Sequence, residues 1–250
     1  KVSICRDGGK YEISFKNDMQ HGIEKWYNKN GQVMQEIPFI NDKRHGVVKY
    51  YYENGSIRLK FPYQNGKLHG VEKWYYENGN LECEIPHENG ERHGVEKGYY
   101  ENGKLEYEIP HENGERHGVE KWYYENEKLR SEIPYENDKL HGVKIEYHEN
   151  GNVEYEIPFL NDKKHGVAKW YRESGELERK TSYINGKVHG LDVWYYENGN
   201  IECETPYIDD KIHGVKKIYD ENGKLKYKKI YRNGIEMPLK RWRRLFSYIF

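Results

Sequence analysis

The sequence predicts an all-β repeat protein: a single-layer, twisted antiparallel meander of about nine β-hairpins, followed by a C-terminal capping helix. Three observations lead to this fold. A His-Gly dipeptide recurs every 24 residues, each interval contains two runs rich in aromatic and aliphatic residues, and most runs are followed by Asn-Gly or Asn-Asp. Asn-Gly between such runs is the strongest short-range hairpin signal, because type I′ turns need positive φ at both central residues.

Positions in the repeat are counted from its histidine, which is position 1. Residues 79–97 are identical to residues 103–121 at 17 of 19 positions, so internal duplication is the simplest origin of the repeat. Nine repeats occupy residues 21–236, and a partial repeat precedes them at residues 1–20. The nine histidines are His21, His45, His69, His93, His117, His141, His165, His189 and His213.

Each repeat is expected to form one hairpin around its first turn. Glycine occupies position 11 of that turn in every repeat except one, where Glu127 replaces it. The pairs expected across a two-residue turn are Lys73 with Glu84, Trp74 with Cys83, and Tyr76 with Leu81. This register places opposite charges across from each other on one face, which stabilises a hairpin by about 0.2–1 kcal/mol per pair.

Proline recurs at position 18, late in the second run. It is present as Pro38, Pro62, Pro86, Pro110, Pro134, Pro158 and Pro206. Because proline cannot donate to a β-ladder, it is confined to sheet edges, strand ends and bulges. We therefore expect the second strand to end before the proline, and the link to the next histidine to be an ordered loop.

Composition restricts the class of protein further. Hydrophobic residues make up 35% and charged residues 33%, while tyrosine alone contributes 25 residues. Tyrosine supplies a large buried area with a polar tip, which suits a thin fold without a conventional core. The net charge is −1, and basic residues concentrate in residues 237–250, so the repeats themselves are acidic. Nucleic-acid binding by the repeats is not expected, since it needs a basic stripe.

Cysteine content and hydropathy bear on location. Cys5, Cys83 and Cys203 form an odd set without a motif, which favours a reducing, cytoplasmic compartment. No run of about 18 apolar residues is present to span a membrane. A cell-surface or secreted location is the alternative, if a signal peptide precedes Lys1.

The repeat resembles a known family through its His-Gly pair, its Tyr-Tyr pair and its two Asn-Gly turns. The pattern HGxxxxYYENGxLxxExxxxNGK is similar to the MORN repeat, in the bacterial variant of the YwqK-type antitoxin family. The resemblance covers about residues 10–236. It departs from the usual MORN unit at position 4, where Glu24, Val48 or Glu72 stands in place of a second glycine. The resemblance implies a binding or scaffolding array without catalysis, and an antitoxin or immunity role.

Metal binding, cofactors and catalysis are not expected. Neighbouring hairpins advance a sheet by about 9.6 Å, so equivalent histidines lie too far apart to share a zinc ion, whose ligands lie within about 4 Å of each other. His87 and His111 are additional to the repeat, and their spacing matches no metal motif. Glutamate and lysine recur in ladders with no distinctive environment, so no catalytic residue is assigned and the protein is not expected to be an enzyme.

Position 6 varies and is the candidate partner-binding site. The residues assigned to it are Trp74, Gly98, Trp122, Glu146, Trp170 and Trp194. Gly98 lies between two tryptophans in this column, so the missing ring is expected to leave a slot in an aromatic face, where binding hot spots concentrate. Neutral variation on a tolerant surface is the alternative. Position 7 is tyrosine in all nine repeats, which indicates packing between repeats.

Residues 237–250 are predicted to form a basic amphipathic helix. Trp242, Leu245, Phe246 and Ile249 recur at helical spacing, whereas Lys240, Arg241, Arg243 and Arg244 lie off that stripe. The helix is expected to cap the last hairpin. A helix that lies on an anionic membrane or docks in a partner's groove is the alternative.

The function expected from the sequence is a non-catalytic protein-binding array of the antitoxin or immunity type, with a toxin as the first candidate partner. Two rivals stay open: a surface or secreted bacterial interaction protein, and a membrane-associated scaffold that uses the C-terminal helix. The array is expected to be a monomer or an edge-mediated dimer, because an open sheet edge exposes unpaired backbone groups.

The capping interpretation predicts the effect of truncation. Cutting the chain after Glu236 removes the apolar stripe, each residue of which contributes at most about 1.5–3 kcal/mol at full burial. The truncated protein should oligomerise at concentrations where the full chain is monomeric, as measured by sedimentation. A truncated chain that stays monomeric and equally stable would favour the membrane or partner interpretation instead.

Overall fold

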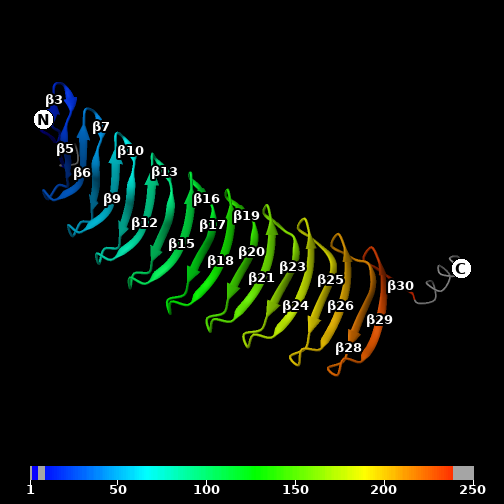
Figure 1. Ribbon diagram of the computed structural model, residues 1–250. Helices are drawn as coiled ribbons and strands as arrows, with labels where there is room; N and C mark the ends of the chain where they lie inside the picture. The colour runs from blue at the N-terminus through cyan, green and yellow to red at the C-terminus, as the bar shows by residue number, and fades with distance from the viewer. Residues whose placement is uncertain (1, 5–8, 239–250) are drawn as a thin grey trace. The chain divides into compact units, whose positions relative to one another are not determined.

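The computed structural model describes residues 2–4 and 9–238, which form two compact units that divide between Glu127 and Lys128. Apart from a separate two-stranded sheet within residues 15–20, the strands of each unit form an open antiparallel sheet of repeated hairpins (Figure 1). The described residues contain no helix, and hence none long and apolar enough to cross a membrane. The predicted all-β architecture is confirmed in this part of the chain.

The strands of the first unit are β1 (Val2–Ile4), β2 (Lys10–Glu12), β3 (Phe15–Lys16), β4 (Met19–Gln20), β5 (Gly22–Tyr27), β6 (Val33–Ile40), β7 (Lys43–Arg44), β8 (Gly46–Tyr51), β9 (Ile57–Gln64), β10 (Lys67–Leu68), β11 (Gly70–Tyr75), β12 (Leu81–Glu88), β13 (Glu91–Arg92), β14 (Gly94–Tyr99), β15 (Leu105–Glu112), β16 (Glu115–Arg116) and β17 (Gly118–Tyr123). Those of the second are β18 (Leu129–Glu136), β19 (Lys139–Leu140), β20 (Gly142–Tyr147), β21 (Val153–Leu160), β22 (Lys163–Lys164), β23 (Gly166–Tyr171), β24 (Leu177–Ile184), β25 (Lys187–Tyr195), β26 (Ile201–Ile208), β27 (Lys211–Ile212), β28 (Gly214–Tyr219), β29 (Leu225–Arg232) and β30 (Ile235–Met237).

The predicted register holds up to the sixth residue of the repeat and fails beyond it. Lys73 pairs with Glu84 and Trp74 with Cys83, as expected. Leu81, however, pairs with Tyr75 rather than with Tyr76, because the register shifts between Trp74 and Tyr75. The same shift recurs at the equivalent place in the other hairpins, for example between Trp194 and Tyr195.

The first turn is the physical reason for this shift. The Gly79 amide donates to the Tyr76 carbonyl, and the Tyr76 amide donates to the Asn80 carbonyl. Only Gly79 has positive φ in this turn, so it is a longer loop closed by a left-handed residue and not the expected type I′ turn. Where glycine is missing, Glu127 adopts the same left-handed conformation, with φ of 67°.

The second turn is the two-residue type I′ turn that the sequence predicts. Both central residues have positive φ in the glycine form, Asn89-Gly90, and in the aspartate form, Asn41-Asp42. Consecutive second turns are also hydrogen-bonded to each other. The Gly90 amide donates to the Leu68 carbonyl of the preceding repeat over 2.8 Å.

The expectation that the second strand ends before the proline is wrong. Strand β12 continues through Pro86, which pairs with Val71. The Pro86 carbonyl accepts the amide of His93 over 3.0 Å, and that histidine separates β13 from β14. The missing proline N–H is therefore tolerated because the neighbouring strand is interrupted there. Where Ser182 replaces proline, β25 runs through the histidine without interruption.

Alternation along the strands gives each sheet two chemically different faces. Positions 4, 6, 15, 17 and 19 share the tryptophan face, as the pairs in the register show. Positions 3, 5, 16, 18, 20 and 23 share the opposite face, here called the lysine face. Buried side chains such as Val48, Ile85 and Ile157 lie on the tryptophan face, so the thin core lies there.

Tyrosines connect successive repeats. The Tyr99 hydroxyl donates to the Glu84 carboxylate of the preceding repeat over 3.1 Å, and Lys73 pairs with the same carboxylate over 3.3 Å. The Tyr76 hydroxyl donates to the Tyr99 carbonyl of the following repeat over 2.8 Å. Position 7 therefore packs between repeats, as its uniformity suggested.

The chain before the first histidine follows the repeat in part. Tyr11 pairs with Trp26, and the Glu12 carboxylate accepts a hydrogen bond from the Tyr27 hydroxyl. Tyr11 and Glu12 thus take the roles of positions 15 and 16 in the full repeats. At the other end, Met237 belongs to β30, so the predicted helix does not begin there. The rest of that predicted helix, with Trp242 and its neighbours, lies outside the described residues.

The tyrosine contacts predict loss of stability at alkaline pH. Burial and, second to it, the acceptor carboxylate of each raise the pKa of Tyr51, Tyr99 and Tyr147 to about 12. Because an unfolded tyrosine has a pKa near 10, this contribution is complete below about pH 10 and is lost as pH rises towards 12. Thermal melts should therefore shift downwards across this range, in step with phenolate absorbance. A melting temperature independent of pH between 9 and 12 would contradict the role of these contacts.

Candidate functional site

The varying column at position 6 forms one row across the strands of each unit. In the first unit, consecutive paired residues are Tyr11, Trp26, Gln35, Tyr50, Leu59, Trp74, Cys83, Gly98, Tyr107 and Trp122. In the second they are Ser131, Glu146, Tyr155, Trp170, Arg179, Trp194, Cys203, Ile218 and Tyr227. The six predicted site residues thus lie in two rows on the tryptophan face, three in each unit.

Buried carboxylates hold the indole rings in place. Glu72 and Glu120 at position 4 are each 6% exposed. The Trp74 Nε1 donates to Glu72 over 2.5 Å, and the Trp122 Nε1 donates to Glu120 over 2.6 Å. A buried carboxylate is costly unless it is hydrogen-bonded, so these contacts fix the orientation of the rings. Sequence reasoning noted the acids at position 4 but not this pairing.

The predicted open slot at Gly98 is wrong. Gly98 is buried, and a Cβ atom at this position would lie 2.0 Å from the Tyr107 ring. Tyr107, its cross-strand partner, therefore fills the space that a tryptophan occupies in other repeats. Its ring contacts Trp122 with centroids 4.8 Å apart, and its hydroxyl donates to Glu96 over 3.3 Å. The substitution at Gly98 exchanges one aromatic ring for another and leaves no notch.

In the second unit, Arg179 lies between Trp170 and Trp194 in the row, at the repeat position that Cys83 occupies in the first unit. The Arg179 guanidinium carbon lies 5.2 Å from the Trp170 ring centroid and 4.6 Å from that of Trp194. Arg179 also pairs with the buried Asp192 over 2.7 Å, and the Thr181 hydroxyl donates to the same carboxylate oxygen. Cations over indole faces are attracted by the ring quadrupole, so this pair of tryptophans is held rigidly.

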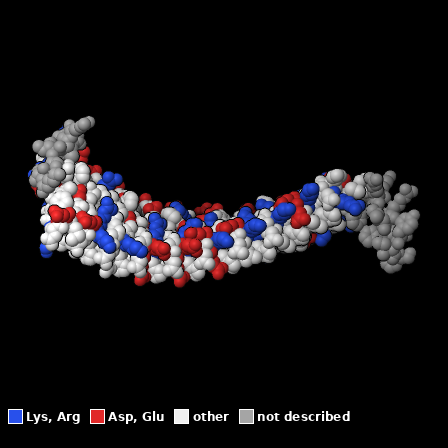
Figure 2. All heavy atoms as spheres, turned by 90° about the horizontal axis from the view of Figure 1, so that it is seen from above, with Lys and Arg blue, Asp and Glu red and all other residues white. Residues whose placement is uncertain are grey.

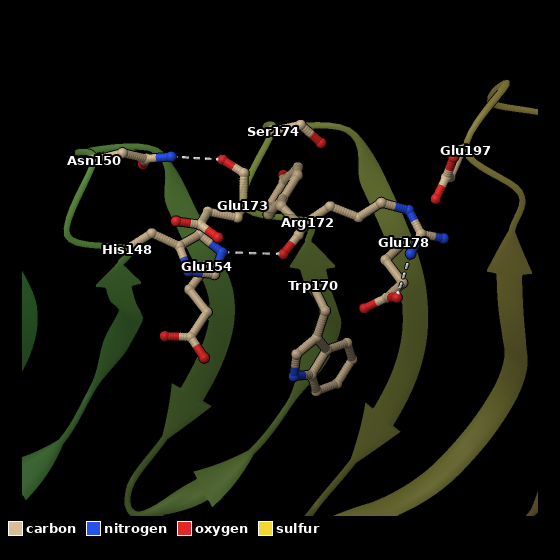
Figure 3. A pocket seen from close by; sticks show the side chains of 10 residues that line it. His148, Asn150, Glu154, Trp170, Arg172, Glu173, Ser174, Glu178 and Glu197 are labelled. Carbon is tan, nitrogen blue, oxygen red and sulfur yellow. Dashed lines mark hydrogen bonds and ion pairs between the residues drawn. The ribbon is translucent and has the colours of Figure 1, made fainter.

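Beside Trp170, the second unit has an open hollow of about 800 Å³ (Figure 3). The hollow lies next to first turns, where His148 and Arg172 replace the tyrosine of position 8. Arg172 donates to Glu178 over 2.6 Å and to the Tyr195 carbonyl over 2.8 Å. The other charged groups around the hollow are Glu154, Glu173 and Glu197. One paired arginine thus faces a predominantly acidic lining.

Sequence reasoning missed this hollow, although a signal was present. Position 8 is tyrosine in five repeats, and it departs from that residue at two consecutive repeats, as His148 and Arg172. Because position 8 belongs to the Tyr-Tyr pair of the repeat, its replacements indicate a site only together with the open space that the structure shows beside them. Glu154 and Glu197 come from repeat positions that are charged in many repeats, and only the structure brings them to the same hollow.

The histidines of the described residues make contacts within and between repeats, and Cys83 and Cys203 are buried free thiols. His87 Nε2 lies 2.9 Å from the buried Glu72, whereas repeat histidines such as His93 bond the preceding proline carbonyl through their amide. No group of three or more potential ligands among the described residues could hold a metal ion. Burial and, second to it, the charge of nearby Glu96 raise the pKa of the Cys83 thiol to about 12, so Cys83 is a neutral thiol at pH 7.

The exchange of rings at Gly98 gives a stability prediction. Gly98→Trp alone forces an indole against the Tyr107 ring and should destabilise the array by about 1–3 kcal/mol, as overpacking does. The double variant Gly98→Trp/Tyr107→Cys recreates the Trp74–Cys83 pair and should recover most of that loss. Urea unfolding of both variants tests this. A stable single variant would show that Tyr107 does not occupy the site in solution.

The chain was compared with known proteins. The model of the MORN repeat variant family matches it at residues 20–41, 44–65, 68–89, 92–113, 116–137, 140–161, 164–185, 188–209 and 212–233. No curated protein matches the chain. Nine matches cover most of the sequence, and they coincide with the repeats counted from the histidines. The chain therefore belongs to the MORN repeat variant family.

Proposed function

We propose that this protein is a non-catalytic protein-binding array, and that its partner seats a basic side chain in the hollow beside Trp170. The observation that carries the proposal is the composition of this hollow. A rigid indole adjoins several carboxylates, while the single arginine in the lining is already paired with Glu178. Such a site combines an apolar surface with negative charge, which suits a lysine or arginine side chain.

The surrounding structure supports a preformed site. The Asn150 side chain donates to the Glu173 carbonyl over 2.7 Å, so consecutive first turns are fixed to each other. The Arg179 guanidinium contacts both Trp170 and Trp194 and is itself paired with the buried Asp192. Preorganised side chains lose little conformational entropy on binding, which favours affinity.

The resemblance to antitoxin repeats makes a toxin the first candidate for the partner, and this finer assignment rests on the resemblance alone. A direct test is to co-express the protein with each captured partner. The partner should arrest growth when expressed alone, and this protein should relieve the arrest.

Binding at the hollow is tested by a pair of matched double variants. Glu154→Lys/Glu197→Lys reverses two carboxylates of the lining. Glu82→Lys/Glu125→Lys makes the same change at the same repeat positions three repeats earlier. Because charge reversal at a desolvated contact costs several kcal/mol, we expect the first variant to lose about a hundredfold or more in affinity for partners captured from the native cell. The second variant should bind normally. Equal binding by both variants, with unchanged thermal stability, would rule out this hollow as the partner site.

A further inference from the structure

The lysine face carries an exposed stripe of apolar side chains. It is formed by position 3, and its side chains are 42–48% exposed. The residues are Ile23, Val47, Val71, Val95 and Val119 in the first unit, and Val143, Val167 and Leu191 in the second. Position 18, usually proline, pairs with position 3 and widens the stripe, as in the pair of Val71 and Pro86. Continuous exposed apolar surface of this kind marks an interaction site.

In the third and fourth repeats, residues 69–116 of the first unit, the stripe is bordered by acids, whereas the two repeats before them have Lys43 and Lys67 at this border. Glu88 pairs directly with Glu91, and Glu112 with Glu115, all four being exposed. They lie on the lysine face, because position 20 alternates with position 18 along the strand. Like charges directly opposite each other destabilise a sheet. None of the four belongs to a group of described residues that could hold a metal ion.

The nearby arginines do not neutralise this acidic border. Arg92 and Arg116 belong to position 24, on the tryptophan face, where they pair with Glu96 over 3.0 Å and Glu120 over 3.6 Å. Seen from above, acidic and basic side chains are therefore interspersed along the edge (Figure 2). On the lysine face, by contrast, the acids of positions 20 and 23 are grouped in the third and fourth repeats.

In the second unit, the fifth repeat has the pair Glu136 and Lys139 at these positions, and the sixth to eighth repeats are aliphatic and basic there. The pairs in these three repeats are Leu160 with Lys163, Ile184 with Lys187, and Ile208 with Lys211. The three aliphatic side chains are 41–44% exposed, so the stripe is two rows wide here. The lysines are exposed and form its border. Aspartates of the adjoining turns are engaged elsewhere, since Asp162 and Asp210 accept the amides of Leu140 and Val188.

We propose that the lysine face binds a second copy of this chain, with the acid-bordered stripe of one copy against the lysine-bordered stripe of the other. At each contact, the exposed valines of one copy would pack on the aliphatic side chains of the other. The four glutamates of the first copy would face the three lysines of the second. A second copy has the same repeat spacing, about 9.6 Å, so the side chains stay in step over several repeats. Sheets that pack face to face bury such alternating apolar rows between them.

A reciprocal charge swap tests this on the full chain. One variant carries Glu88→Lys, Glu91→Lys, Glu112→Lys and Glu115→Lys. The other carries Lys163→Glu, Lys187→Glu and Lys211→Glu. Each variant alone brings like charges together at the contact, so its self-association should weaken by about tenfold or more relative to the unchanged protein. Mixing the two variants restores opposite charges at both contacts, so the mixture should associate as well as the unchanged protein does.

The measurement is sedimentation over a range of concentrations, with circular dichroism to check folding. A control variant with Glu53→Lys, Glu77→Lys, Glu101→Lys and Glu125→Lys changes the net charge equally at the first-turn edge, and it should associate normally. Partner capture through the hollow is unaffected by the swapped positions, so failure of one proposal leaves the other standing. An unchanged protein that is monomeric at all concentrations, or a mixture that associates no better than either variant, would overturn the inference.

Discussion

The tyrosine at position 7 of each hairpin contacts position 16 of the hairpin before it, and this contact between neighbours holds the array in step. In most repeats the tyrosine hydroxyl donates to a glutamate there, whereas Lys60 and Lys180 lie over the rings of Tyr75 and Tyr195 instead. Tyr51, Tyr99 and Tyr147 make this hydrogen bond with Glu36, Glu84 and Glu132, and lysines such as Lys25 and Lys73 complete the charge balance of the acceptors. Because a single-layer sheet has no second layer, one hairpin must be positioned by its neighbours alone. Backbone bonds between consecutive second turns, such as Gly90 to Leu68, add a second fixed point at the other end of each strand.

The two faces use this frame differently. On the tryptophan face, acids such as Glu72 and Asp192 are buried and occupied by indole donors, so the rings are oriented but partly exposed. On the lysine face, aliphatic side chains at position 3 stay exposed because nothing in the hairpin covers them. A thin fold thus keeps two surfaces available for binding, and the proposals for the hollow and for self-association concern opposite faces.

Substitutions in the repeat are compensated within the sheet more often than the columns suggest. Gly98 is matched by Tyr107 across the strand pair, and the absence of proline at Ser182 is matched by an uninterrupted β25. The replacements at His148 and Arg172 differ, because they open a hollow beside Trp170 instead of filling one. A departure from the repeat therefore indicates a site only when its cross-strand and neighbouring positions leave the space open.

The sequence alone determined the repeat, the hairpins, the type I′ second turn and the pairing of Lys73 with Glu84, because these depend on local φ preferences and on alternation along a strand. It misplaced the Tyr76 pairing, the strand end at Pro86 and the slot at Gly98. Each of these depends on a neighbour: the length of the first-turn loop, the interruption at His93, and the ring of Tyr107. Tertiary structure also decided which charged residues meet at the hollow. Residues of three consecutive repeats converge there, and no column of the repeat contains that information.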